Sequence, residues 1–132
     1  MIVIDAAAAV ELLTEKGEVG EWVADAIARE DALGAPHLID PEVLAALRNL
    51  VVRGEITPGA ASEAVVGFEA LPMTRYPVTS LIERIWKLRR RLTPHDASYV
   101  ALAEALDLPL LTTDSRLARA GGHCARIVAF GA

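Results

Sequence analysis

The chain has 132 residues, of which 53% are hydrophobic, and its formal net charge is −5. This length suits one domain, residues 1–132, built around a single core, and the charge disfavours a protein that binds nucleic acid through overall basicity. The apolar runs are too short to span a bilayer and the first residues lack a signal-peptide pattern, so we expect a cytoplasmic protein with no membrane partner.

The first third of the chain alternates strand-like and helix-like segments. Residues 2–4 are a β-branched run that predicts a strand, and residues 6–13 have a helix-forming composition. An apolar stripe that begins at Trp22 predicts a second helix, which we expect to end near Gly34. Residues 35–39 then form a short link or strand.

Prolines and glycines delimit the elements in the middle of the chain. Pro41 suits the first position of a helix, and Gly54 closes that helix. Residues 57–58, Thr-Pro, begin another helix, which Pro72 stops. Residues 73–76 predict a short strand.

The remaining third repeats the alternation. From Val78 we expect one helix with an apolar face and a basic face, and Thr93 with its following proline begins the next. Residues 110–113 predict a buried strand, residues 115–120 a helical turn, and residues 126–129 a last strand. Short strands that alternate with helices predict an α/β fold, a three-layer α/β/α sandwich with a central parallel sheet of about four to five strands.

Four carboxylates stand where a strand-like or loop segment gives way to a helix-like one. They are Asp5, Glu42, Asp96 and Asp114. In a parallel sheet the carboxyl ends of the strands line one crevice, so acids that are far apart in sequence can meet there. Converging carboxylates bind hard divalent cations. The pattern therefore predicts metal-assisted attack on a phosphodiester.

Each acid also has a structural explanation, because helix starts favour Asp and Glu. Asp114 fits an N-cap, Asp96 follows Thr93 in a capping-box-like pattern, and Glu42 lies in a first helical turn. Asp5 is harder to explain in this way, because it ends a strand that we expect to be central and buried. An unpartnered carboxylate there is costly, and a cation is a natural partner.

The residues around these acids resemble those of the PIN-domain nucleases. The first strand ends at Asp5, Glu42 lies in Pro-Glu-Val, Asp96 lies in Thr-Pro-His-Asp-Ala, and Asp114 ends Leu-Thr-Thr-Asp. Their order and spacing are most similar to VapC-like toxins of toxin–antitoxin pairs, over essentially the whole chain.

One departure from that family concerns the residues after the first acid. Such proteins usually carry Ser or Thr one or two residues after it, whereas here Ala6 and Ala7 follow. Thr112 is the remaining hydroxyl candidate for support near the metal. The loss of that hydroxyl keeps open a second hypothesis, a catalytically silent PIN-like module that binds RNA or protein.

The resemblance implies an endoribonuclease that depends on Mg²⁺, with Mn²⁺ as an alternative, and that cuts structured RNA such as tRNA or rRNA to inhibit translation. All-oxygen ligands select such hard ions, and a bound metal activates water for hydrolysis. Asp5 and Asp96 are the expected principal ligands. Glu42 and Asp114 are expected to hold metal-bound waters or a second ion.

The resemblance also implies two protein partners, a second copy of the chain in a homodimer and an antitoxin whose tail occupies a groove near the acids. Apolar residues in predicted helices indicate more apolar surface than a small core buries, although packing within the monomer also explains them. They are Trp22, Val65, Val66, Phe68 and Trp86.

Basic residues on the helix expected from Val78 are candidates for RNA contact. Arg84, Lys87 and Arg91 recur at helical spacing and predict a stripe that meets phosphates, although a solvated charged face explains them equally well. The single cysteine, Cys124, excludes a zinc site built on cysteines, and we expect it to be a free thiol in the core. The three histidines are too scattered to form a metal site.

Overall fold

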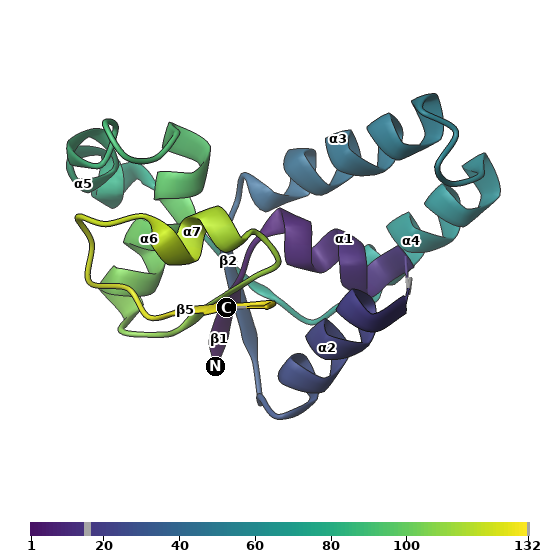
Figure 1. Ribbon diagram of the computed structural model, residues 1–132, viewed down its shortest axis with the longest axis horizontal. Helices are drawn as coiled ribbons and strands as arrows, with labels where there is room; N and C mark the ends of the chain where they lie inside the picture. The colour runs from purple at the N-terminus through teal and green to yellow at the C-terminus, as the bar shows by residue number, and fades with distance from the viewer. Residues whose placement is uncertain (15–16, 132) are drawn as a thin grey trace.

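The computed structural model describes residues 1–14 and 17–131, and its centre is one parallel β-sheet. The strands pair in the order β3-β2-β1-β4-β5, and all neighbours run parallel. Figure 1 shows the sheet and the helices around it. The strands are β1 (Ile2–Ile4), β2 (Leu33–Pro36), β3 (Thr74–Tyr76), β4 (Leu110–Thr112) and β5 (Ile127–Ala129).

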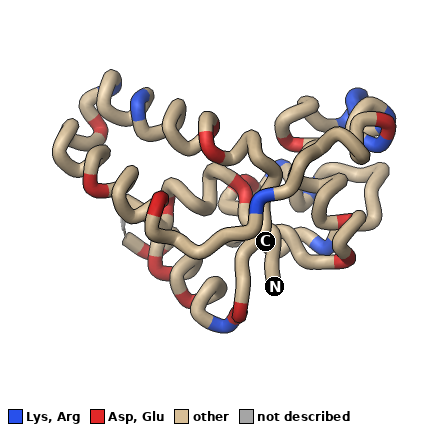
Figure 2. Tube along the Cα trace, turned by 180° about the vertical axis from the view of Figure 1, so that it is seen from behind, with Lys and Arg blue, Asp and Glu red and all other residues tan. Residues whose placement is uncertain are grey.

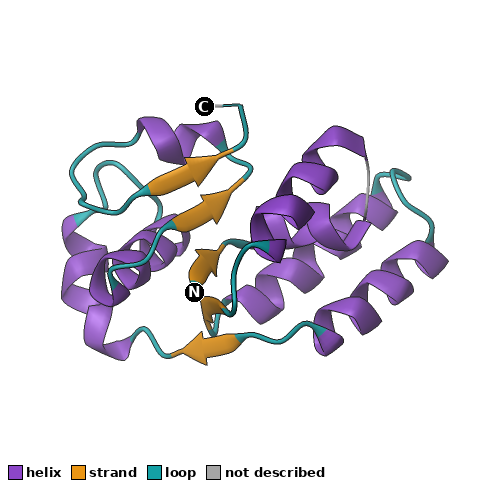
Figure 3. Ribbon diagram, turned by 90° about the horizontal axis from the view of Figure 1, so that it is seen from below, coloured by secondary structure: helices purple, strands orange, loops and turns teal. Residues whose placement is uncertain are grey.

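Helices lie on both sides of this sheet, as the view in Figure 3 shows. One group comprises α1 (Ala6–Thr14), α2 (Gly17–Ala28), α3 (Ile39–Val52) and α4 (Pro58–Ala70). The other comprises the 3₁₀ turn η1 (Thr79–Leu81), α5 (Ile82–Lys87) and α6 (Pro94–Leu106), while α7 (Ser115–Arg119) packs beside β5. The predicted three-layer α/β/α sandwich is confirmed.

The middle strand, β1, ends at Ile4 and positions Asp5, the first of the four acids. All three of its residues are buried, as expected for a strand covered by helices on both faces. Its neighbours are β2, with Val3 opposite Gly34, and β4, with Ile4 opposite Leu111. Because the strands are parallel, the segments that follow β1, β2 and β4 leave the sheet at the same edge.

The hydrophobic core lies between the sheet and the helices. Its largest fully buried side chains come from β1, α2, α3, α6 and β4, so every layer contributes to it. They are Val3, Ile4, Val23, Ile39, Val43, Leu47, Val100, Leu110 and Leu111. Burying an aliphatic side chain of this size stabilises the fold by about 1.5–3 kcal/mol, which fixes the strand ends relative to the helices.

Two boundaries differ from the prediction in the first half of the chain. The second helix ends at Ala28 rather than near Gly34, which instead lies in the buried strand β2. No glycine or proline stands between Ala28 and Leu33 to mark the end, and pairing with β1 decides it. Helix α3 begins at Ile39, two residues before Pro41, and a proline is tolerated there because the first-turn N–H groups lack helical partners.

The single helix expected from Val78 is wrong, because the segment breaks into η1, α5 and a series of turns. Leu88 and Leu92 are buried after the end of α5, so the apolar pattern continues although the helix does not. Pro94 disfavours a helical conformation at the residue before it, which forces a new start at α6. Thr93 caps that start by accepting a hydrogen bond from the Asp96 backbone N–H at 3.2 Å.

Among the described residues, no helix is long and apolar enough to cross a bilayer.

Candidate metal and RNA site

Two of the four acids lie just beyond the carboxyl ends of the two neighbouring strands β1 and β4. Asp5 follows β1, and its Oδ1 accepts a hydrogen bond of 2.8 Å from the Ala8 backbone N–H in the first turn of α1. Asp114 lies two residues after β4, and its Oδ1 accepts one of 2.9 Å from the Arg116 backbone N–H at the start of α7. Both acids therefore serve as helix caps at one edge of the sheet.

Asp5 is the most buried of the four, with 6% of its surface exposed. Burial raises its pKa to about 6, against the opposing effect of hydrogen bonds from the Thr112 hydroxyl and the Ala8 N–H. The negative charges of Asp96 and Asp114 raise it further, which places all three acids within electrostatic reach of one another. Asp5 therefore has two hydrogen-bond donors within the protein, yet these hydrogen bonds do not offset its burial.

Thr112 connects the two strand ends. Its hydroxyl donates to Asp5 Oδ2 and accepts a hydrogen bond of 3.0 Å from the Asp114 backbone N–H. The side chain is fully buried at the end of β4. The predicted supporting residue therefore does contact the first acid, from the opposite strand.

Asp96 approaches the same edge from α6. Its backbone N–H is used in the cap with Thr93, whereas its carboxylate, half-buried, has no hydrogen-bond or ion-pair donor among the described residues. A carboxylate that faces other acids without such a donor is suited to a cation.

Glu42 reaches the site from the first turn of α3. Arg75 of β3 anchors that turn, because its guanidinium pairs with both oxygens of Asp40 at 2.8–2.9 Å. Glu42 Oε1 accepts a hydrogen bond of 2.6 Å from the phenol of Tyr99 on α6. The phenol also lies within electrostatic reach of Asp5, so Glu42 borders the same cluster.

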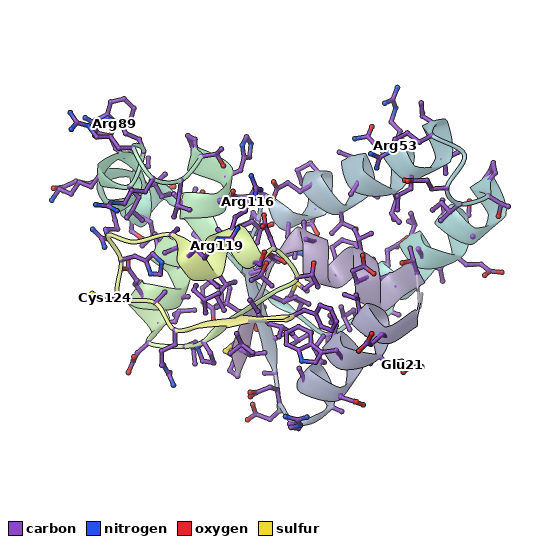
Figure 4. The ribbon with its side chains drawn as sticks, in the orientation of Figure 1. Glu21, Arg53, Arg89, Arg116, Arg119 and Cys124 are labelled. Carbon is purple, nitrogen blue, oxygen red and sulfur yellow. The ribbon has the colours of Figure 1, made fainter. Side chains whose placement is uncertain are left out.

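The Arg116 guanidinium forms an ion pair with the Asp114 carboxylate. Its Nη2 lies 2.6 Å from Oδ2, and its Nε lies 3.1 Å from both oxygens. The Arg116 side chain is 75% exposed, and Figure 4 shows it where α7 meets the beginning of α1. The guanidinium holds the pKa of Asp114 below its usual range. The negative charge of Asp96 also stabilises the charged Arg116 guanidinium.

The acids converge without forming a closed cage. Within residues 1–14 and 17–131, no three His, Cys, Asp or Glu side chains are set to hold one ion. Nevertheless, every candidate ligand atom is a carboxylate oxygen, and burial makes the ionised form of Asp5 costly. The Asp96 carboxylate has no hydrogen-bond or ion-pair donor among the described residues. The residues therefore fit a hard divalent cation, provided that Arg116 moves away from Asp114.

The proposed RNA stripe does not form a single helical face. Arg84 binds both oxygens of Glu104 at 2.8–2.9 Å and donates to the Gly122 carbonyl oxygen, so it holds the segment after α7 against α6. Lys87 pairs with Glu83, and Arg91 lies beyond the end of α5. Figure 2 shows that basic residues still gather around this end of the molecule.

Two contacts were not foreseen from the sequence. The sequence gives no local signal for the Tyr99 contact, because its partner, Glu42, lies 57 residues earlier in the chain. Arg116 offered a local signal, since a basic residue two positions after an acid that caps a helix can bend back onto it. Neither the Tyr99 nor the Arg116 contact follows from the motif of four acids alone.

Two expectations about single side chains have mixed outcomes. Cys124 is a free thiol as expected, but it is exposed, so the predicted place in the core is wrong. Phe68 is buried and Trp22 packs edge-to-face on Phe130, whereas Val66 and Trp86 stay largely exposed.

Comparison with known proteins agrees with this architecture. Residues 2–123 match the PIN domain family. Ribonuclease VapC1 of Mycobacterium tuberculosis (strain ATCC 25618 / H37Rv) is 48% identical over 121 residues, which cover 91% of this chain and 90% of the relative. VapC ribonuclease Mb0985 of Mycobacterium bovis is 42% identical over 121 residues, 92% of this chain and 91% of the relative.

A solved structure supports the fold at low sequence identity. The crystal structure of Mycobacterium tuberculosis VapC20, described as a sarcin-ricin loop cleaving toxin, superposes with a TM-score of 0.69. It is 16% identical and covers 94% of this chain and 97% of its own. The match to the PIN domain over residues 2–123 and the identity to VapC ribonucleases show that the chain belongs to the PIN-domain family, among the VapC ribonucleases.

Proposed function

We propose that the protein is the toxin of a toxin–antitoxin pair and that it hydrolyses phosphodiester bonds in structured RNA with the help of a divalent metal. The observation that carries the proposal is the convergence of Asp5, Asp96 and Asp114 at one sheet edge, where Asp5 is buried and its pKa is raised to about 6. Structural acids in a helix-capping role alone gain nothing from such mutual repulsion.

Mg²⁺ fits this site best, with Mn²⁺ as a substitute, because every donor is a carboxylate oxygen. Asp5 and Asp96 would hold the ion directly, and Glu42 and Asp114 would hold its waters or a second ion. When bound, such a metal supplies an activated water and stabilises the charge that develops on the phosphate. Hydrolysis by water attack would leave a 5′-phosphate on the product.

The protein residues prepare this chemistry in specific ways. Thr112 fixes the Asp5 carboxylate from β4 and the Asp114 backbone at the same time. Arg116 is exposed and already beside two of the acids, so it is placed to move from Asp114 to a phosphate of the RNA. Lys87 and Arg91 would add phosphate contacts, while Arg84 serves the fold.

Two protein partners complete the proposal. An apolar groove between α5 and α6, which includes Ile82, Trp86 and Pro94, suits the interface of a homodimer. Trp86 is 63% exposed at this groove. An antitoxin would place its tail in a groove near the four acids, where a basic side chain would neutralise their charge.

The direct test is to incubate purified, antitoxin-free protein with total RNA and Mg²⁺ and to map new 5′-phosphate ends. Discrete ends that require Mg²⁺ and vanish in Asp5→Asn support the proposal. An absence of cleavage by the parent on several structured RNAs would instead support a silent binding module.

A further inference from the structure

Tyr99 makes a contact that the four-acid pattern does not explain. Its side chain is 2% exposed, and its phenol donates a hydrogen bond of 2.6 Å to Glu42 Oε1. The buried phenol therefore acts as a fixed hydrogen-bond donor beside the acids.

The position of Tyr99 in α6 ties it to the site. It lies three residues after Asp96, so both side chains project from one face of the helix. The bond from Tyr99 crosses to α3 and links the helix that carries Asp96 to the turn that carries Glu42. Two acids from different elements are thereby held at a set separation.

A glutamate needs such a restraint more than an aspartate does. Asp5 is short, buried and held by two donors, whereas Glu42 has a longer side chain and lies half-exposed in the first turn of α3. Ordering a glutamate side chain costs up to about 2 kcal/mol of rotamer entropy, which would otherwise be lost when the cation binds. Among the described residues only Oε1 has a donor, so Oε2 keeps its full capacity to accept.

We propose that Tyr99 is a positioning residue that fixes the Glu42 carboxylate at the edge of the cation site before a divalent ion binds. The inference rests on the proposed function, because it assumes that Glu42 contributes to a metal site. Tyr99 acts through Glu42 and does not touch the ion or the RNA.

The chain offers a matched control for this inference, because it contains two tyrosines. Among the described residues, the Tyr76 hydroxyl makes only a long contact of 3.9 Å with Met1 Sδ, which lies at the other end of β1. Tyr99→Phe and Tyr76→Phe therefore remove the same atom, inside and outside the site. Both keep the aromatic ring that packs in the fold.

Mn²⁺ binding to the purified full-length protein, measured by calorimetry without RNA, gives the readout. We expect Tyr99→Phe to weaken Mn²⁺ affinity by about tenfold or more, as for other groups that orient metal ligands. Tyr76→Phe should leave the affinity unchanged. In a Glu42→Ala background, Tyr99→Phe should add no further loss, because its effect passes through the missing carboxylate.

Three outcomes overturn the inference. Unchanged Mn²⁺ affinity in Tyr99→Phe, even with a lower melting temperature, would mean a structural role only. An equal loss in the Glu42→Ala background would mean that Tyr99 acts by another route. A parent protein that does not bind Mn²⁺ would remove the proposed metal site itself and the inference with it, which distinguishes the two failures.

A second measurement covers the case in which Tyr99→Phe does not fold. In Tyr76→Phe, Tyr99 is the remaining tyrosine, so incorporation of 3-fluorotyrosine labels it alone. We expect its ¹⁹F resonance to move during a Mg²⁺ titration. In a protein that also carries Glu42→Ala, we expect the resonance to stay fixed during the same titration. A resonance that ignores Mg²⁺ in the protein with Glu42 intact would refute the link.

Discussion

Replacing Asp5 by Asn should stabilise the protein at neutral pH, although it removes a residue of the proposed site. Burial raises the pKa of Asp5 from 3.8 to about 6. One pKa unit is worth 1.36 kcal/mol, so keeping this carboxylate ionised in the fold costs about 3 kcal/mol. The charge is a net burden because the donors from Thr112 and Ala8 do not fully offset burial.

The sign of the pH dependence follows from the direction of this shift. An acid whose pKa is higher in the folded state binds protons more tightly there, so its contribution to stability is full below pH 3.8 and is lost as the pH rises through about 6. Asn carries no such charge, but it has one oxygen instead of two. The variant therefore loses about 1–2 kcal/mol of hydrogen-bond energy, which offsets part of the stability that it gains. The net gain above pH 7 is therefore about 1–2 kcal/mol.

Thermal melts in EDTA at pH 4 and pH 7.5 test this reasoning. Asp5→Asn should melt about 3–6 °C above the parent at pH 7.5, and this advantage should be absent at pH 4. Added Mg²⁺ should raise the melting temperature of the parent more than that of the variant, because a ligand stabilises the state that binds it. A variant that is less stable than the parent by the same amount at both pH values would refute the account of Asp5.

Three other substitutions probe the contacts around the site. Thr112→Val should lower stability by about 2 kcal/mol at pH 7.5 in urea titrations, and by less at pH 5, where Asp5 is largely protonated; an equal loss at both pH values would contradict a bond to an ionised acid. Arg116→Gln should lower the Mg²⁺ concentration that half-saturates the protein, because no guanidinium then has to leave Asp114. The same variant should weaken RNA binding in filter assays. Unchanged values for both measurements would show that the Arg116–Asp114 ion pair is irrelevant to the site. Arg84→Met should make the exposed thiol of Cys124 react faster with a disulfide reagent, because the Glu104-centred anchor of that segment is lost; an unchanged rate would place the anchor elsewhere.

The sequence predicts the strand ends and the acids beside them well, for a physical reason. Asp5 and Asp114 lie where a short apolar run stops. In a parallel sheet the carboxyl ends of neighbouring strands lie at the same edge, so residues at these two boundaries come close together. The Thr93 cap is equally local, because its bond spans three residues.

Contacts between distant elements could not be predicted in the same way. The helix expected from Val78 ends at Lys87 although Leu88 and Leu92 beyond it stay buried, and the apolar period alone does not show where such a helix ends. The bond from Tyr99 to Glu42 depends on how α3 and α6 meet across the sheet edge. Helical spacing predicts that Arg84 contacts RNA, but it does not reveal that Arg84 pairs with Glu104 on another helix.

The central claim is that carboxylates at one sheet edge hold a metal that cleaves RNA, and Asp96→Asn tests it most directly. The Asp96 carboxylate has no donor among the described residues, and Asn preserves the backbone cap, so stability should not fall. We therefore predict that the variant melts at or above the temperature of the parent and loses Mg²⁺-dependent cleavage of total RNA. Cleavage by Asp96→Asn at the rate of the parent would contradict the account.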